Sequence, residues 1–314
     1  GDSLYFESER NYAAATKNVS IFDSLNNSII TGHYGEIFKA KDSAIITRRA
    51  MAINIVDNDS LFIHADTLVA TGPEDKRILR GYYDVRILKS DIRGRSDSIY
   101  LDESIGLTKL LNKPLTKKQE QVFTEADRNA SNPVLCFGES QMTGNKIFLL
   151  SDLETKKLDS IKITGNVFII EKDTLSSDGF QQIKGGLLDG AFENGKLDNI
   201  VITKNTEMVY YLYNDEDLQL IGIDKTTCSA LKMNFVEGQI DDITFLVSPI
   251  GDVYPEDEIP LNDRTLKGFI WRIKERPETV EDLFDENDEA DQFPEILKFQ
   301  FPEESEKKES EKKS

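Results

Sequence analysis

The sequence predicts an all-β protein made of stacked antiparallel hairpin repeats, with a short helical insert and a disordered, acidic C-terminal tail. Three observations lead to this prediction. A nine-residue pattern occurs three times, beginning at Leu153, Phe192 and Phe235. Strand-like alternation of apolar and polar residues fills the chain before residue 113, and no long helical period interrupts it. The last ten residues consist only of Ser, Glu and Lys, a composition that cannot build an apolar core.

The first group of repeats covers residues 1–112. A small residue, Asp, a hydroxyl residue and an aliphatic residue follow one another at three places, starting at Gly1, Ala65 and Ser96. Alternating segments lie between these signatures and end at polar or Gly-containing turns, so we expect short strands throughout. Gly1 falls inside such a strand pattern, and we therefore expect the natural start of the protein to lie further upstream.

Residues 113–132 interrupt the strand pattern. Thr116 and Gln119 form a capping-box signature just after Pro114, and residues 117–130 are rich in helix formers. We expect a short exposed helix or a loose linker here. It separates two groups of repeats that can still share one sheet.

The second group of repeats, residues 133–277, contains the three nine-residue patterns. Each pattern predicts a β-hairpin, because strand-like alternation enters and leaves its polar turn. The second copy has Asn194-Gly195 at the turn, a dipeptide that accepts positive φ at both positions. In each copy the aliphatic residue before the Asp has the opposite parity to the Ile three residues later, which predicts a β-bulge at the Asp. One hairpin cannot bury its apolar face alone, so we expect a stack of hairpins around a shared core.

The strand pattern ends after Pro255. We expect Leu266–Trp271, which holds the only Trp of the chain, to cover the end of the core, because a terminal repeat needs a cap. Thr279 and Asp282 form a second capping-box signature and predict a short helix at the start of residues 278–314. We expect the rest of that segment to be largely disordered.

The net charge of −19 is divided between the two parts of the chain: residues 278–314 carry −9 and the rest carries −10. Because both parts are acidic, we expect no nucleic-acid partner and no adsorption to an anionic membrane. No apolar run approaches the roughly 18–20 residues of a spanning helix, so we expect no stable membrane insertion. No signal-peptide pattern opens the sequence.

The sequence contains no motif that points to an enzyme. Nucleophile-elbow, zinc-protease and nucleotide-binding motifs are missing, and we expect no catalytic residue, metal site or cofactor. His33 and His64 share no local motif and are interpreted as surface or structural residues. Two Asp-rich stretches, 57–59 and 215–217, lack the Gly and distal Glu of an EF-hand loop and are interpreted as solvated turns. A carbohydrate-active β-enzyme remains an alternative, although nothing selects a pair of carboxylates.

Cys136 and Cys228 are the only cysteines and lie 92 residues apart. They form either two buried thiols or a disulfide. Neither interpretation fixes the cellular compartment.

The apolar interior is the remaining candidate for a functional site. It is either an ordinary packed core or a groove, left between two sheets that splay apart, in which inward Ile, Leu, Val and Phe side chains contact an acyl chain. Burial of each methylene group contributes about 0.8 kcal/mol, so long chains can bind without a charged contact.

The repeats resemble those of the OstA-like proteins. The resemblance covers roughly residues 1–284 and rests on many weak motifs, among them residues 165–170, 178–185 and 220–224, with Leu266–Trp271 and Arg276–Phe284 near the end. This family is related to the periplasmic lipopolysaccharide-transport proteins LptA and LptC and to the N-terminal domain of LptD.

The resemblance implies an open β-jellyroll in the periplasm that binds lipid A acyl chains, has no catalytic residues, and pairs with similar jellyrolls through edge strands. The alternative is a structural envelope scaffold that binds protein partners through its edge strands and binds no lipid. The lipid-facing positions that the resemblance implies are inward apolar residues of the second group: Leu149, Ile161, Ile163, Leu188, Phe192, Ile200, Ile202, Leu231, Phe235, Ile243 and Phe245.

Overall fold

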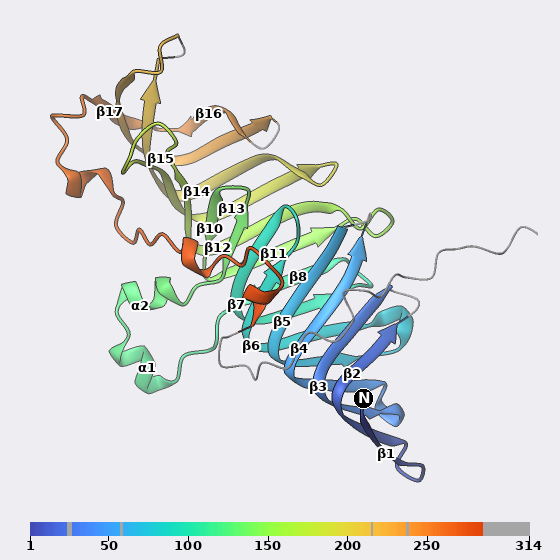
Figure 1. The fold of residues 1–314 in the computed structure, drawn as a ribbon. Coiled ribbons are helices and arrows are strands. Elements are labelled where there is room, and N and C mark those ends of the chain that lie inside the picture. The colour runs from blue at the N-terminus through green and yellow to red at the C-terminus, as the bar shows by residue number, and fades with distance from the viewer. Residues whose placement is uncertain (24–26, 57–58, 215, 237–238, 285–314) are drawn as a thin grey trace, which may run out of the picture. The chain divides into compact units, whose positions relative to one another are not determined.

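The computed structural model describes residues 1–23, 27–56, 59–214, 216–236 and 239–284. Seventeen antiparallel strands form one continuous sheet system in these residues (Figure 1). The strands are β1 Ser3–Glu7, β2 Tyr12–Asp23, β3 Ser28–Phe38, β4 Ser43–Val56, β5 Asp59–Thr71, β6 Ile78–Leu88, β7 Ile92–Asp102, β8 Leu107–Leu111, β9 Val134–Phe137, β10 Ser140–Thr143, β11 Lys146–Ser151, β12 Leu158–Lys172, β13 Phe180–Glu193, β14 Lys196–Tyr213, β15 Leu220–Val236, β16 Gln239–Val247 and β17 Ile250–Tyr254. The all-β prediction is confirmed.

The long strands bend in the middle. Pairs of consecutive residues in the left-handed region interrupt the pairing register of β2, β4, β6, β12 and β14. These pairs are Lys17–Asn18, Arg48–Arg49, Tyr83–Asp84, Gly165–Asn166 and Lys204–Asn205. Each bend divides its strand into two stretches, so the sheet consists of two wings that meet along a corner. Bulges of this kind re-aim strands and increase their twist.

Three strands show the two wings directly. β7 pairs with β8 through its C-terminal stretch and with β9 through its N-terminal stretch. In the same way β12 pairs with β11 and β10, and β15 pairs with β16 and β17. We call the wing that contains β1, β8, β11 and β16 wing A, and the wing that contains β9, β10 and β17 wing B.

Small residues at the corner let neighbouring strands approach closely. A Cβ atom at Gly32 would lie 2.5 Å from Cγ2 of Ile46, and one at Gly185 would lie 2.5 Å from Cγ2 of Ile202. Only glycine fits these two positions without moving the isoleucine of the next strand.

The three predicted hairpins are confirmed as β11–β12, β13–β14 and β15–β16. In each hairpin the pairing register skips one Asp, which is Asp159, Asp198 or Asp241, so the predicted bulges are also present. Asn194 and Gly195 both have positive φ, as the predicted turn requires.

The insert forms two short helices, α1 Lys117–Val122 and α2 Glu125–Ala130. Thr116 and Gln119 make the predicted capping box at α1, and Thr124 and Asp127 make a second one at α2. β8 precedes the insert in wing A and β9 follows it in wing B. The insert therefore replaces a strand bend at the corner, and residues 1–284 form one compact unit around it.

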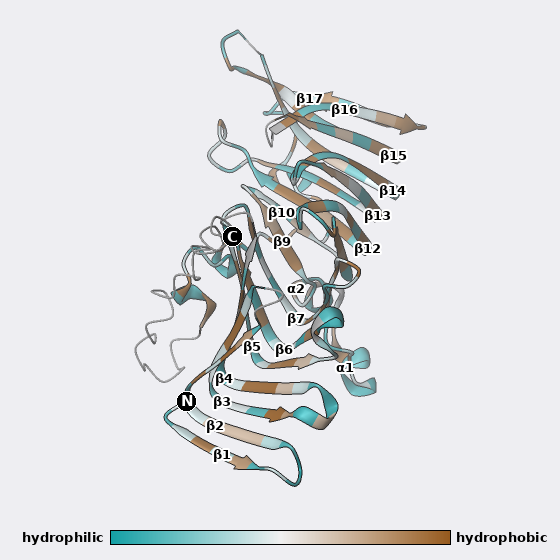
Figure 2. Cartoon of the chain, turned by 90° about the vertical axis from the view of Figure 1, so that its right-hand side faces the viewer, coloured by the Kyte–Doolittle hydropathy of each residue, from teal (hydrophilic) through white to brown (hydrophobic). Residues whose placement is uncertain are grey.

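The shared core lies between the wings. Its buried members include Leu68, Leu110, Ile147 and Leu188, which come from both groups of repeats. Figure 2 shows hydrophobic stretches along the strands and hydrophilic colouring over α1 and α2.

A second apolar cluster covers the outer face of wing B. Residues 255–284, which we call the strap, run along this face after β17 and contain the 3-10 turns η3 Leu261–Arg264, η4 Ile273–Glu275 and η5 Glu281–Leu283 (Figure 1). Leu266, Phe269 and Trp271 pack there against Phe168 and Tyr211. The prediction that Leu266–Trp271 covers the end of the core is therefore wrong. Wing B strands are apolar on both faces, and the strap covers their outer face instead.

The predicted helix after Thr279 is the single turn η5, with backbone N–H of Thr279 donating to Asp282 at 2.7 Å. The predicted disorder of the acidic tail concerns residues 285–314, which lie outside the described residues.

Two buried glutamines hold the backbone of the strap. Gln182 donates to the carbonyl of Arg264 at 2.8 Å and accepts from the backbone N–H of Leu266 at 2.9 Å. Gln141 bonds in the same way to Ile270 and Arg272, at 2.9 and 2.8 Å. Each side-chain amide thus makes the two hydrogen bonds that a neighbouring strand would make. It pairs backbone groups of the strap that burial would otherwise leave without a partner.

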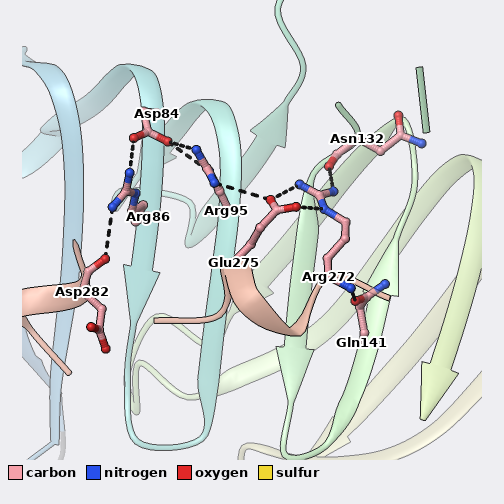
Figure 3. A network of polar contacts seen from close by, with 8 residues as sticks. All are labelled: Asp84, Arg86, Arg95, Asn132, Gln141, Arg272, Glu275 and Asp282. Atoms are coloured by element: carbon pink, nitrogen blue, oxygen red, sulfur yellow. Dashed lines mark hydrogen bonds and ion pairs between the residues drawn. The ribbon is translucent and has the colours of Figure 1, made fainter. Parts of the chain in front are cut away.

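A chain of charges continues this attachment (Figure 3). Arg272 binds Glu275 at 2.6 Å, and Glu275 lies 3.6 Å from Arg95. Arg95 and Arg86 share Asp84, and Arg86 donates to the carbonyl of Asp282 at 3.2 Å. Burial alone would raise the pKa of the Asp84 carboxyl, but the two arginines lower it below its usual value. Asp84 is therefore ionised at neutral pH and keeps both arginines oriented toward the strap.

We expect Gln182→Leu to loosen the strap. The substitution keeps the volume of the side chain but leaves two backbone groups of the strap unpaired, which costs about 2 kcal/mol. Limited trypsin digestion should then cut after Arg264 and Lys267 faster than in the unmodified protein. Gln181→Leu is the control, because Gln181 bonds to Tyr211 of the sheet and not to the strap. Equal cleavage rates in the two variants would contradict the role of Gln182.

Candidate functional site

Two adjoining cavities lie between the wings, one within the first group of repeats and one that reaches from it into the second group. The first has a volume of about 450 Å³ and the second about 400 Å³. Leu61, Ile63 and Leu101 line both cavities, so together they form one groove. Each volume falls within the range of ligand sites, about 300–1,000 Å³.

Small side chains leave the space of the first cavity. Ala44 and Ala70 are paired across β4 and β5 in wing A, and Ala52 faces them from wing B. Larger apolar side chains surround them, namely Ile21, Ile30, Ile37, Ile53 and Leu79. The three alanine side chains are too small to fill the space between the wings at these positions, and the first cavity remains open there.

The second cavity continues the groove toward the second group of repeats. Its apolar lining adds Ile87, Ile92, Ile99, Leu135, Leu149 and Leu158. It ends at the tips of three hairpins, which contribute Lys89 to Asp91 from wing B and Lys156, Lys157 and Lys196 from wing A.

Polar contacts link the wing tips across the mouth of the first cavity. Arg77 of wing A lies 3.5 Å from Asp23 of wing B, and Asn54 of wing B donates to Glu103 of wing A at 3.4 Å. Burial and the neighbouring Asp23 raise the pKa of Glu103, while Lys156 and Arg77 oppose the shift. These long contacts close the mouth weakly, because each can be replaced by water when the wings separate.

The second mouth is rimmed mainly by lysines. Lys89 lies 3.0 Å from Asp91 and 3.3 Å from Asp59, which neutralise it. Lys156 and Lys196 stand on the opposite hairpins, and the rim is therefore positive on the wing A side. Such a rim suits an anionic group that stays in water while an apolar part enters the groove.

The eleven residues named from the sequence all belong to the interior cluster. Ile163, Leu188, Ile200, Ile202 and Leu231 are completely buried. Ile161 is almost completely buried, and Phe192, Ile243 and Phe245 pack at the margin of the cluster. Leu149 lines the second cavity, and Phe235 lines a much smaller one of about 10 Å³. Their role in binding stays a prediction.

Sequence reasoning missed the groove residues of the first group of repeats. The inward residues at positions 44, 52 and 70 are all Ala, and this recurrence of small side chains at inward positions was the available signal.

The thiols and histidines lie outside the groove. Cys136 and Cys228 are both free and buried, so the structure contains no disulfide between them. Burial raises the pKa of Cys136 to about 11, despite three nearby arginines, and its thiol is therefore protonated at neutral pH. His64 is buried, with Nδ1 2.8 Å from the carbonyl oxygen of Ala50 and its ring against Phe284, which fits a structural role.

The described ranges contain no group of three His, Cys, Asp or Glu side chains placed to hold a metal ion. Of the Asp-rich stretches, Asp57, Asn58 and Asp215 lie outside the described residues. None of the helices in the described part of the chain is long and apolar enough to cross a membrane.

No protein-family model matches the chain, and no curated protein sequence matches it. Among solved structures, the chain is similar to LptH from Pseudomonas aeruginosa, the LptA-homologous periplasmic component of the lipopolysaccharide transport device, with a TM-score of 0.35 and 12% identity. The match covers 52% of this chain and 95% of the LptH chain. The case for a function rests on the groove itself.

Proposed function

We propose that the protein is a non-enzymatic lipopolysaccharide-transport or outer-membrane assembly protein that holds lipid A acyl chains in the groove between its wings. The adjoining apolar cavities of about 450 and 400 Å³ carry this proposal. Each methylene group that leaves water there contributes about 0.8 kcal/mol. Burial of several methylene groups therefore provides binding free energy without any covalent bond.

The mouths of the groove fit an amphiphile with a phosphorylated headgroup. Acyl chains lie along the groove and reach toward the Asp23–Arg77 and Asn54–Glu103 contacts at its first mouth. The phosphates stay outside, within reach of Lys156 and Lys196 at the second mouth. Charge at the rim therefore orients the lipid, and apolar burial holds it.

The sheet ends offer sites for partner proteins in the periplasm, where such a carrier would work. Within the described residues β1 pairs only with β2, and β17 pairs only with β15. Leu4, Phe6 and Ile250 on these strands are 72%, 57% and 76% exposed. Edge strands with exposed apolar side chains can add a strand from another jellyroll. These edges also favour the second candidate, a structural scaffold that binds proteins and no lipid.

Native mass spectrometry of the protein, expressed in the periplasm of a lipopolysaccharide-producing host, separates the two candidates. A carrier is expected to retain mass increments of lipid A or lipopolysaccharide, and added lipid A should restore them after extraction. Self-assembled copies without any lipid, before and after addition of lipid A, would reject the carrier and leave the scaffold.

A further inference from the structure

A separate polar cavity lies at the corner, on the outer side of the sheet. It has a volume of about 270 Å³ and shares no lining residue with the groove. The bends of β12 and β14, strand β13, helix α2 and strap residues 267–272 surround it. We call it the corner cavity.

The corner cavity is positively charged in an acidic protein. Lys184, Lys204, Lys267 and Arg272 line it, with Glu207 as the only acidic side chain of the lining. Glu207 binds Lys184 at 2.9 Å, and Arg272 is held by Glu275. No ion pair within the described ranges involves Lys204. The lining therefore keeps a positive charge although the whole chain carries −19.

Amide groups supply the other half of the site. Asn129, Asn132, Asn166 and Asn205 line the cavity. The Oδ1 atom of Asn129 is buried and has no hydrogen-bond partner in the described part of the chain. The Nδ2 atom of the same amide lies beside Gly268 of the lining, so Asn129 can donate a hydrogen bond to a ligand oxygen in the cavity.

Two glycines open the walls of the cavity to these groups. The side-chain stem of Lys204 lies over Gly186, where a Cβ atom would come within 2.8 Å of it. Gly268 of the strap lies against the Asn129 amide, 3.0 Å from the position of a Cβ atom. Side chains at either position would push Lys204 or Asn129 away from its present place.

We propose that the corner cavity binds a small hydroxylated anion of the sugar-phosphate class. Lys204 and Lys184 pair with the phosphate, and the Asn129 amide donates a hydrogen bond to the oxygen of a ring hydroxyl group. The volume of about 270 Å³ lies just below the usual range of ligand sites, about 300–1,000 Å³, and admits one sugar ring with one anionic substituent. This site is independent of lipid binding, because strap and corner form it without the groove.

Isothermal titration calorimetry of the full chain with glucose 6-phosphate, glucose and inorganic phosphate tests the proposal. The sugar phosphate should bind more tightly than either of the other two probes. Lys204→Gln is expected to raise its Kd about tenfold, as for loss of one charge-assisted hydrogen bond. Asn129→Ala should weaken the binding of glucose 6-phosphate but leave the binding of inorganic phosphate unchanged.

Lys41→Gln, at an exposed turn far from the corner in sequence and outside the cavity lining, is the matched control and should leave the Kd unchanged. Circular dichroism and thermal unfolding verify that each variant is folded. The proposal is overturned if no probe binds, if Lys204→Gln and Lys41→Gln behave alike, or if inorganic phosphate binds as tightly as the sugar phosphate. Loss of lipid binding would not affect any of these outcomes.

Discussion

Replacing Ala44 by Phe is expected to lower the affinity for lipid A by about a hundredfold. Ala44 lines the first cavity and is only partly buried, so a phenyl ring at this position extends into open space between the wings. It would occupy the volume of three to four methylene groups of an acyl chain. At about 0.8 kcal/mol each, their loss amounts to roughly 2.5–3 kcal/mol of binding free energy.

Equilibrium binding of radiolabelled lipid A measures this effect. Ala191→Phe is the control: it introduces the same ring on β13 at a residue that lines neither cavity. Both variants should have a free energy of unfolding close to that of the unmodified protein, because neither ring enters a filled core. Unchanged affinity in Ala44→Phe would show that lipid does not occupy the first cavity.

The hairpins were predictable because each depends on a few neighbouring residues. The parity of Leu197 and Ile200 is enough to place a bulge at Asp198, and Asn194-Gly195 is enough to define the turn. The division into core and groove depends instead on how far apart two wings lie. Alternation shows that Ala44 and Leu188 both point inward, but it does not show what stands opposite them.

The strap was misplaced for a related reason. Its attachment through Gln141 and Gln182 joins residues more than 80 positions apart in the chain, and no local pattern marks such a contact. One signal was present. The run Val167 to Ile170 is apolar at every position, which indicates a strand that is covered on both faces. The strap is the element that covers the outer one.

Leu188→Ala is expected to cost about 3–4 kcal/mol of stability while the affinity for lipid A stays unchanged in the folded protein. Leu188 is completely buried in wing A, paired with Ile163 of β12 and Ile202 of β14, and lines neither cavity of the groove. Removal of its isobutyl group leaves a hole in a filled part of the core, and such substitutions typically cost this much. Urea unfolding followed by circular dichroism measures the loss.

Leu149→Ala is expected to lower the stability less than Leu188→Ala does and to lower the affinity for lipid A more. One side of Leu149 already faces the second cavity, so truncation removes fewer packing contacts and costs less than Leu188→Ala, about 2 kcal/mol. It also removes apolar lining from the groove, and the affinity for lipid A should fall. If Leu188→Ala weakened lipid binding as much as Leu149→Ala did, the acyl chains would extend beyond the two cavities to β13, and the wings would have to open there when lipid binds.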